Sequence, residues 1–347
     1  MSPARTRVLP ALAFAFACLA AAPATAQSAP READCRDDSG QDRCLPEAQA
    51  RQRAAYGVAP IDQVAAAKTV MMRAFFVDGY GRDAALVSFV RAPATEPRVD
   101  VRFPKADAGP AEPPSLTATV TAAVWDELVA EGRLFERKLA PAPASAMLSI
   151  CLHSWVVTVE AVDANGSIRR KTEGACDAGL AVPFAFRLAK AAVAAMPACG
   201  LIDPETSRND ITRLGVCTML GGDRQAAAQA LNAYEATWFA NPRGPDFARA
   251  LQYQFHEQVD FAWPGLAPVK GSQAASEVWA REAATHRFRP RRIFGERADR
   301  VRIEGSIDLT ERVDNAPRRE VPATMTWTRE NGFGFRMRRL ESGPLPR

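Results

Sequence analysis

Three stretches near the end of the chain alternate apolar and polar residues, and this pattern sets the strongest limit on the fold. The apolar positions are Val301, Ile303, Ile307 and Leu309, then Val321, Ala323, Met325 and Trp327, then Phe333, Phe335 and Met337. Successive side chains of a β-strand point to opposite faces of a sheet, so a period of two predicts half-buried strands. Glu330-Asn331-Gly332 supplies a tight turn before the last strand. The chain must therefore end in an antiparallel sheet whose apolar face needs a covering layer.

The residues before these strands predict helices that can supply this layer. Asp223 is a good N-cap for a helix with an apolar stripe at Ala227, Leu231, Tyr234 and Trp238. The next elements are a short helix, a strand and a third helix. Their apolar residues are Phe247, Ala250, Leu251 and Phe255 in the short helix, which ends at His256, then Val259, Phe261 and Trp263 in the strand, then Ala275, Val278, Trp279, Ala283 and His286 after a cap at Ser272.

This order of elements, over residues 223 to 340, resembles the nuclear transport factor 2-like superfamily, and within it the SnoaL-like branch. The residues that carry the resemblance are Tyr234 and Trp238 in the opening helix, the string from Val259 to Gly265, Gly271 before the helix with Trp279, and Asn331-Gly332 before Phe333. The resemblance implies an α+β fold in which a cone-shaped, curved antiparallel sheet packs on helices around an apolar pocket. The expected pocket residues are Tyr234, Trp238, Trp263, Trp279 and Trp327.

Members of this superfamily include isomerases, cyclases, dehydratases and non-catalytic binding or dimerisation domains, so the fold does not give the function. The ketosteroid-isomerase-like members place a general-base Asp just before the Pro of a turn, where this chain has Trp263. An indole cannot shuttle a proton as a carboxylate can. The remaining acid/base candidates are His286, Asp260 and His256, and each has a structural reading as well. Catalysis stays open, and the sequence favours binding.

The start of the chain predicts export. Arg5 and Arg7 precede an apolar run, and the small residues at Ala24-Thr25-Ala26 predict cleavage of residues 1–26 before Gln27. We therefore expect a periplasmic or secreted protein with no membrane span after cleavage. Residues 27–67 are polar and Ala-rich, and are expected to form a partly disordered extension.

A first folded unit is expected over residues 68–222 and the SnoaL-like unit over residues 223–347. The first unit is expected to be a small α+β domain of a family that its sequence does not identify. Its expected strands are Val70–Val77, Ala84–Arg91, Val99–Phe103, Met147–Val162 and Ser167–Gly174, and its expected helices are Val124–Val129, Ala181–Met196 and Ile211–Leu220. Gly132 is expected to end the first helix in the left-handed conformation.

Six cysteines follow Cys18, which lies in the expected signal. They form three pairs that are local in sequence: Cys35 and Cys44, Cys151 and Cys176, and Cys199 and Cys217. An oxidising compartment favours disulfides, and we predict these local pairings among the connectivities that six cysteines allow. Buried free thiols are the alternative.

The remaining features predict no cofactor and no metal. His256-Glu257-Gln258-Val259-Asp260 lacks the last ligand of the zinc pattern His-Glu-x-x-His. The net charge of +4 is small, so no nucleic-acid partner is expected. Two arginine groups are read either as an anion-binding surface or as a solvated sheet face with acidic neighbours. They are Arg287, Arg289, Arg291 and Arg292, and Arg336, Arg338 and Arg339.

Three functions remain in view. The favoured one is non-catalytic binding of a small apolar ligand or of a protein partner, including a second copy through the C-terminal sheet. The second is a SnoaL-like isomerase, cyclase or dehydratase, which needs two titratable groups that converge in one pocket. The third is a structural protein of the cell envelope.

Overall fold

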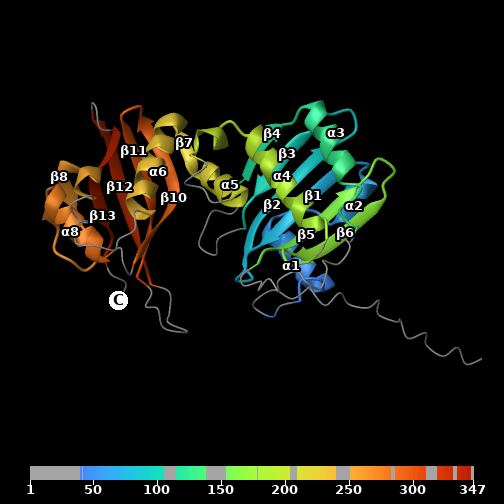
Figure 1. The fold of residues 1–347 in the computed structure, drawn as a ribbon, viewed down its shortest axis with the longest axis horizontal. Helices are drawn as coiled ribbons and strands as arrows, with labels where there is room; N and C mark the ends of the chain where they lie inside the picture. The colour runs from blue at the N-terminus through green and yellow to red at the C-terminus, as the bar shows by residue number, and fades with distance from the viewer. Residues whose placement is uncertain are drawn as a thin grey trace, which may run out of the picture. The chain divides into compact units, whose positions relative to one another are not determined.

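The computed structural model describes residues 40, 42–104, 115–137, 154–177, 179–203, 209–239, 251–282, 286–309, 319–330 and 334–344, without the side chains of residues 237–239. Their strands form one sheet of six strands and one of seven, with helices packed on both sheets (Figure 1). The expected mixed α+β class is confirmed, and most neighbouring strands of the two sheets are antiparallel. The chain divides into Met1–Ala33, which lies outside the described residues, and Asp34–Arg347.

The first sheet has the order β4-β3-β2-β1-β5-β6, and all its neighbouring strands are antiparallel. Its strands are β1 (Val70–Val77), β2 (Asp83–Arg91), β3 (Arg98–Arg102), β4 (Ser115–Thr119), β5 (Val156–Val162) and β6 (Ile168–Gly174). A turn joins β1 to β2, in which Asp78 Oδ1 accepts from the backbone N–H groups of Tyr80 and Arg82 at 3.0 Å each. A tight turn that contains Asn165-Gly166 joins β5 to β6. The sequence analysis missed β4, a short edge strand without large apolar residues apart from Leu116.

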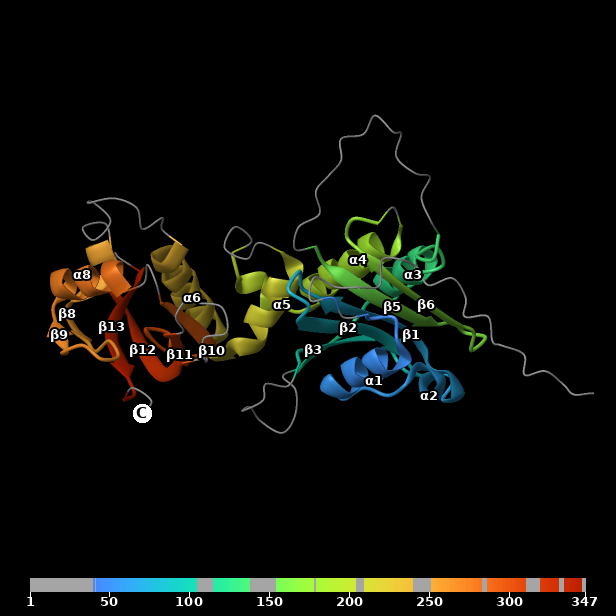
Figure 2. The same ribbon diagram turned by 90° about the horizontal axis from the view of Figure 1, so that it is seen from below.

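Helices cover both faces of this sheet (Figure 2). One face carries α3 (Ala122–Glu131) and α4 (Ala181–Ala195), and the other carries α1 (Pro46–Ala55) and α2 (Ile61–Ala66). Strand β1 is buried on both sides, which explains why its residues are apolar apart from Arg73.

Residues 27–67 were expected to form a partly disordered extension, and the described part of this segment contains the helices α1 and α2. Tyr56 is fully buried, with its ring centroid 5.8 Å from that of Phe75. Ile61 packs with Met71 and Val162. Two apolar anchors thus hold helices whose own apolar periodicity is too weak to recognise.

A buried carboxylate on β5 reinforces this layer. Glu160 is 0% exposed and contacts three arginines from three elements. Its Oε2 accepts from Arg73 Nε on β1 at 2.6 Å, and its Oε1 accepts from Arg170 Nε on β6 at 2.7 Å and from Arg53 NH1 on α1 at 3.4 Å. Burial lowers the pKa of Arg73, and the carboxylate of Glu160 opposes this by favouring the charged form.

Gly132 follows α3, but its φ is −60°, so the predicted left-handed end of that helix is wrong. The reason for glycine here is space. A Cβ on Gly132 would lie 3.0 Å from Phe184 Cζ and 3.3 Å from Met72 Sδ. Glycine therefore allows the end of α3 to lie close to α4 and the sheet.

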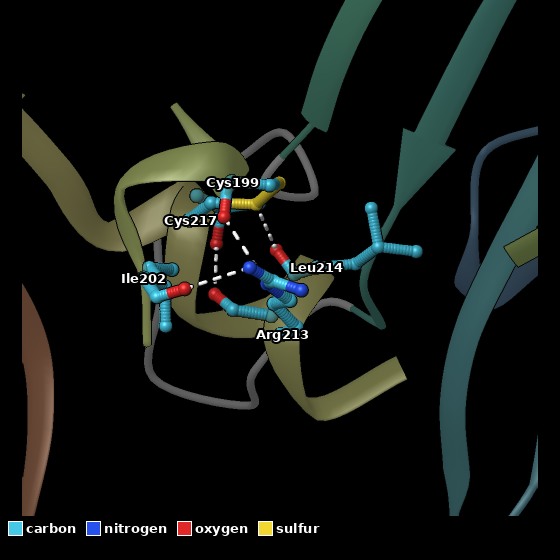
Figure 3. The surroundings of a disulfide bond; sticks show 7 residues. Cys199, Ile202, Arg213, Leu214 and Cys217 are labelled. Carbon is cyan, nitrogen blue, oxygen red and sulfur yellow. Dashed lines mark hydrogen bonds between the residues drawn. A yellow bond between two sulfur atoms is a disulfide. The ribbon is translucent and has the colours of Figure 1, made fainter. Parts of the chain in front are cut away.

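The predicted disulfide between Cys199 and Cys217 is present, with Cα atoms 5.1 Å apart. It joins the 3-10 helix η1 (Cys199–Leu201) to α5 (Asp210–Met219). Arg213 on α5 donates to the carbonyl oxygens of Cys199 at 3.1 Å and Ile202 at 2.7 Å, beside the sulfur bridge (Figure 3). Cys44 and Cys176 are also disulfide-bonded, and their predicted partners Cys35 and Cys151 lie outside the described residues.

The second sheet has the order β7-β10-β11-β12-β13-β8-β9. Its strands are β7 (Leu220–Gly222), β8 (Phe255–Phe261), β9 (Val269–Lys270), β10 (Arg287–Arg297), β11 (Arg300–Asp308), β12 (Glu320–Glu330) and β13 (Gly334–Ser342). The alternating apolar residues of β11 and β12 are buried as predicted. Strand β7 pairs with β10, so this sheet begins just before the expected boundary at residue 223. Its helices are α6 (Arg224–Phe239) and α8 (Ser272–Glu282).

Two segments of the second sheet differ from the prediction. The 3-10 helix η2 (Gln252–Gln254) ends before Phe255, so Phe255 and His256 begin strand β8 instead of completing a helix. The arginine-rich segment after α8 is strand β10, which the sequence analysis missed. A bulge between Pro290 and Arg292 shifts the register, so the buried residues Phe288 and Ile293 no longer share one parity.

Candidate functional site

The aromatic residues predicted to line one pocket lie in two packed groups. Trp263 and Trp279 contact each other with ring centroids 5.8 Å apart, together with Phe255 and Phe261. Tyr234 on α6 instead packs edge-on against Trp327, with centroids 6.5 Å apart. These rings largely contact other rings. The side chain of Trp238 lies outside the described residues.

Polar atoms in these groups differ in how they are satisfied. The buried hydroxyl of Tyr234 donates to the carbonyl oxygen of Phe288 at 3.1 Å, and burial raises the pKa of this phenol. The indole N–H groups of Trp263 and Trp327 are buried without a hydrogen-bond acceptor among the described residues. An unpaired buried donor is uncommon and points to a missing acceptor or a strained site.

The three predicted acid/base candidates each have an ionic partner of their own. Asp260 is exposed on β8 and lies 3.3 Å from Lys270 Nζ. His256 Nε2 lies 2.8 Å from Glu330 Oε1, and His286 Nδ1 lies 3.5 Å from Glu282 Oε2 just after α8. Each of the three side chains thus has a separate charged neighbour among the described residues.

The arginine groups of the second sheet also have acidic neighbours. Arg289 lies 2.6 Å from Asp308, Arg291 lies 2.8 Å from Glu320, and Arg336 lies 3.1 Å from Glu330. The exposed residues Arg289 and Arg291 match the reading as a solvated face of mixed charge, whereas Arg336 is buried.

A cavity of about 620 Å³ lies at one end of the first sheet, under α3. Its volume falls within the range of about 300–1,000 Å³ that is typical of small-ligand sites. The floor is apolar, with Met72 on β1, Trp125 on α3 and Ala161 on β5 buried, and Val70 and Val129 half-buried. Strand alternation places Val70, Met72 and Ala161 on the face that α3 covers.

The rim of the cavity is cationic. Lys68, Arg91, Arg133 and Arg169 line it, and Asp163 is its single carboxylate. Asp163 Oδ1 accepts from the backbone N–H groups of Asn165 and Ser167 at 2.9 Å each, so this carboxylate serves the β5–β6 turn. Among the described residues, no carboxylate pairs with Lys68, Arg91 or Arg133.

Arg169 holds the roof of the cavity to the sheet. Its NH1 donates to the carbonyl oxygen of Gly132 at 2.7 Å, and its guanidinium carbon lies 5.3 Å above the ring centroid of Phe135. These contacts fix the end of α3 over β6 and orient one cation of the rim.

The mouth of the cavity has unusual backbone. Lys68 has φ 53° and Ala94 has φ 58°, and they are the non-glycine residues with positive φ in the described part of the chain. Lys68 follows α2, where its N–H donates to Ala65 O and that of Thr69 donates to Val64 O, the bond pattern that commonly ends a helix with glycine. Ala94 follows Pro93 at the position of a type II turn that favours glycine. Such backbone is commonest at functional sites.

The sequence analysis missed this cavity because no motif marks it. Its lining spans residues 68 to 169 and comes from four strand ends, one helix and the turns between them. Separate cationic residues resemble ordinary surface residues until pairing of β1 with β2 and β5 brings them to one end of the sheet. One local signal could have indicated the site: a lysine, Lys68, ends a helix at a position where glycine is usual.

The described residues contain no cluster of three or more His, Cys, Asp or Glu side chains that could hold a metal ion. No helix in these ranges is long and apolar enough to cross a membrane.

No protein-family model and no curated protein matches the sequence. Among solved structures, the ketosteroid isomerase-like protein of Erwinia carotovora atroseptica SCRI1043 is 13% identical with a TM-score of 0.29, and the match covers 35% of this chain and 98% of that one. A candidate dehydratase of the NTF2-like family from Streptomyces avermitilis is 16% identical with a TM-score of 0.28, covering 34% and 95%. The epoxide hydrolase/cyclase-like enzyme SalBIII is 17% identical with a TM-score of 0.26, covering 35% and 93%. The structural neighbours are thus proteins described as ketosteroid isomerase-like, NTF2-like and cyclase-like, each over about a third of this chain.

Proposed function

We propose that this chain is an exported, non-catalytic binding protein that holds a small ligand between α3 and the first sheet. The observation that carries the proposal is the cavity of about 620 Å³, with an apolar floor and a polar rim. Such a combination is the usual form of a small-ligand site. Asp260, His256 and His286 each contact a different charged neighbour, which favours binding over a shared acid/base site.

Ligand-dependent thermal unfolding of the whole protein tests this proposal. A ligand that binds the folded state raises the unfolding temperature with concentration. The panel contains octanoate, octyl phosphate, octanamide and octylammonium, which share one apolar tail and differ in the head group. The matched control is Val129→Phe, which fills the cavity from α3. Stabilisation of the wild type that is lost in Val129→Phe supports the site, whereas equal responses in both proteins for the whole panel would rule it out.

A second candidate site lies in the second sheet, where the sequence analysis placed an apolar ligand. The observation that favours it is the pair of buried indole N–H groups on Trp263 and Trp327 without an acceptor. A ligand carbonyl or ether oxygen would satisfy such a donor. Ligand-induced change in tryptophan emission that persists in Trp125→Phe and disappears in Trp263→Phe would assign binding to this sheet.

A further inference from the structure

We infer that the cavity under α3 takes an amphipathic anion, with an apolar body and one carboxylate or phosphate head group. This inference rests on the proposed function and names the ligand class of the same site. It is argued from the charge of the rim, the chemistry of the floor and the backbone at the mouth.

The rim selects the sign of the charge. Four cationic side chains and one carboxylate surround the opening, and the carboxylate already accepts two backbone hydrogen bonds. Elsewhere in the chain, cations such as Arg289 and Arg291 have carboxylates within 2.8 Å. Grouped cations without such partners raise the local concentration of anions and favour an anionic ligand. Arg169 is oriented by Gly132 and Phe135, which reduces the entropy that it loses on binding.

The floor selects the other end of the ligand. Met72, Trp125 and Ala161 are buried apolar residues, and none of their side chains carries a charge. Val70 and Val129 are only half-buried, and an inorganic anion alone would leave their apolar surface in contact with water. A ligand with an aliphatic or aromatic body would cover it, and each buried methylene contributes favourably. The ligand is therefore expected to place its charged head group near the cations of the rim and its apolar tail against the floor.

The backbone at Lys68 supports a binding role for that cation. A glycine would adopt its φ of 53° without steric cost, yet the chain has a lysine at the cavity mouth. Ala94 occupies similar backbone at the same mouth and has no charge. Lys68→Gly and Ala94→Gly therefore relieve comparable backbone strain, but only the first removes a cation. This pair separates electrostatic binding from an effect of backbone mobility.

The test is isothermal titration calorimetry of the whole protein with octanoate, octyl phosphate, octanamide and inorganic phosphate. We expect the two amphipathic anions to bind at least tenfold more tightly than octanamide, and inorganic phosphate to bind more weakly than octyl phosphate. The carboxylate and phosphate arms show which head group fits better. Lys68→Gly, Arg91→Gln and Arg133→Gln should each weaken octanoate binding about fivefold, as expected for exposed ion pairs. Ala94→Gly changes backbone at the same mouth without removing a cation, so it should weaken octanoate binding less than Lys68→Gly does. Lys190→Gln on α4, which removes one charge away from the cavity, should leave binding unchanged.

The outcomes separate this inference from the proposed function. Equal binding of octanamide and octanoate, with no effect of Lys68→Gly, would contradict the inference that the ligand is an anion. The cavity would then remain a site for a small ligand of another class. Equal binding of inorganic phosphate and octyl phosphate would contradict the inference that the ligand has an apolar body. Absence of binding by every compound, or binding that Val129→Phe does not reduce, would overturn the proposed site itself. Emission changes that Trp125→Phe removes, while calorimetric binding persists, would place the tail on the floor.

Discussion

Lys68 and Ala94 each have a backbone conformation at the mouth of the cavity that lowers the stability of the fold. Both adopt left-handed backbone, which costs a residue with a Cβ about 1–2 kcal/mol relative to its right-handed alternative. We expect Lys68→Gly and Ala94→Gly each to raise the free energy of unfolding by about 0.5–1 kcal/mol, after the extra entropy of glycine in the unfolded chain is subtracted. Urea denaturation of the two variants measures this, and destabilisation of both would contradict the backbone argument.

Glu160 is the residue whose loss should harm the fold most. Its carboxylate is buried among Arg53, Arg73 and Arg170. Removing one partner of a buried ion pair costs about 3–5 kcal/mol, because the other charge stays buried without compensation. We therefore expect Glu160→Gln to lower the free energy of unfolding by about that amount.

The control for Glu160→Gln is Glu127→Gln on α3. Glu127 pairs with Arg187 but is 53% exposed, so its loss should cost about 1 kcal/mol or less. Similar losses in the two variants would mean that the buried network adds nothing beyond surface pairing.

Strand β10 shows at the scale of an element how a bulge depends on its neighbour. Pro290, at the bulge, lies opposite Gly305 on β11. A Cβ on Gly305 would lie 2.1 Å from the carbonyl oxygen of Arg289, so the backbone must shift to accept alanine. We expect Gly305→Ala to lower the free energy of unfolding by about 2–3 kcal/mol, measured by chemical denaturation. Gly200→Ala is the control, because nothing lies within 4 Å of its added Cβ, and a neutral Gly305→Ala would contradict the bulge geometry.

The disulfide between η1 and α5 gives a second prediction at this scale. Cys199 and Cys217 are 18 residues apart, and closing a loop of this length stabilises the fold by about 3 kcal/mol in the chain-entropy treatment. The double variant Cys199→Ser/Cys217→Ser should lose about this much in urea denaturation. The double variant removes only the disulfide between Cys199 and Cys217, whereas a reductant would also reduce the disulfides of Cys44 and Cys176. An unchanged denaturation midpoint would show that the hydrogen bonds of Arg213 suffice to hold the two helices.

Sequence predicted those elements whose periodicity is regular, and missed those that irregular geometry or distant partners define. Strands β11 and β12 keep one parity throughout and were predicted correctly, whereas the bulge at Pro290 hid β10. Helices α1 and α2 depend on Tyr56, Ile61 and the distant Glu160. The sequence of these two helices has no regular apolar spacing that would predict these contacts. The cavity depends on strand pairing across about a hundred residues, which no local window can register.

At the scale of the whole molecule, export and cross-linking make one joint prediction. The expected cleavage after Ala26 and the three predicted disulfides give the mature protein the mass of residues 27–347 less six hydrogens. Intact-mass measurement of the exported protein checks this, and non-reducing peptide mapping checks Cys35–Cys44 and Cys151–Cys176. A mass that retains Met1 to Ala26, or Cys151 linked to Cys35, would contradict the compartment or the pairing.

The buried ion network also constrains the order in which the protein can fold. Arg53 and Glu160 are 107 residues apart, and synthesis proceeds from the N-terminus. Helices α1 and α2 are thus made long before β5, the strand that supplies their buried carboxylate. Contacts between residues so far apart form slowly, because a long loop must close first. The contact of Arg53 with Glu160 is therefore expected to form after the closer ones of Tyr56 with Phe75 and Ile61 with Met71, so α1 completes its docking only once β5 has been made.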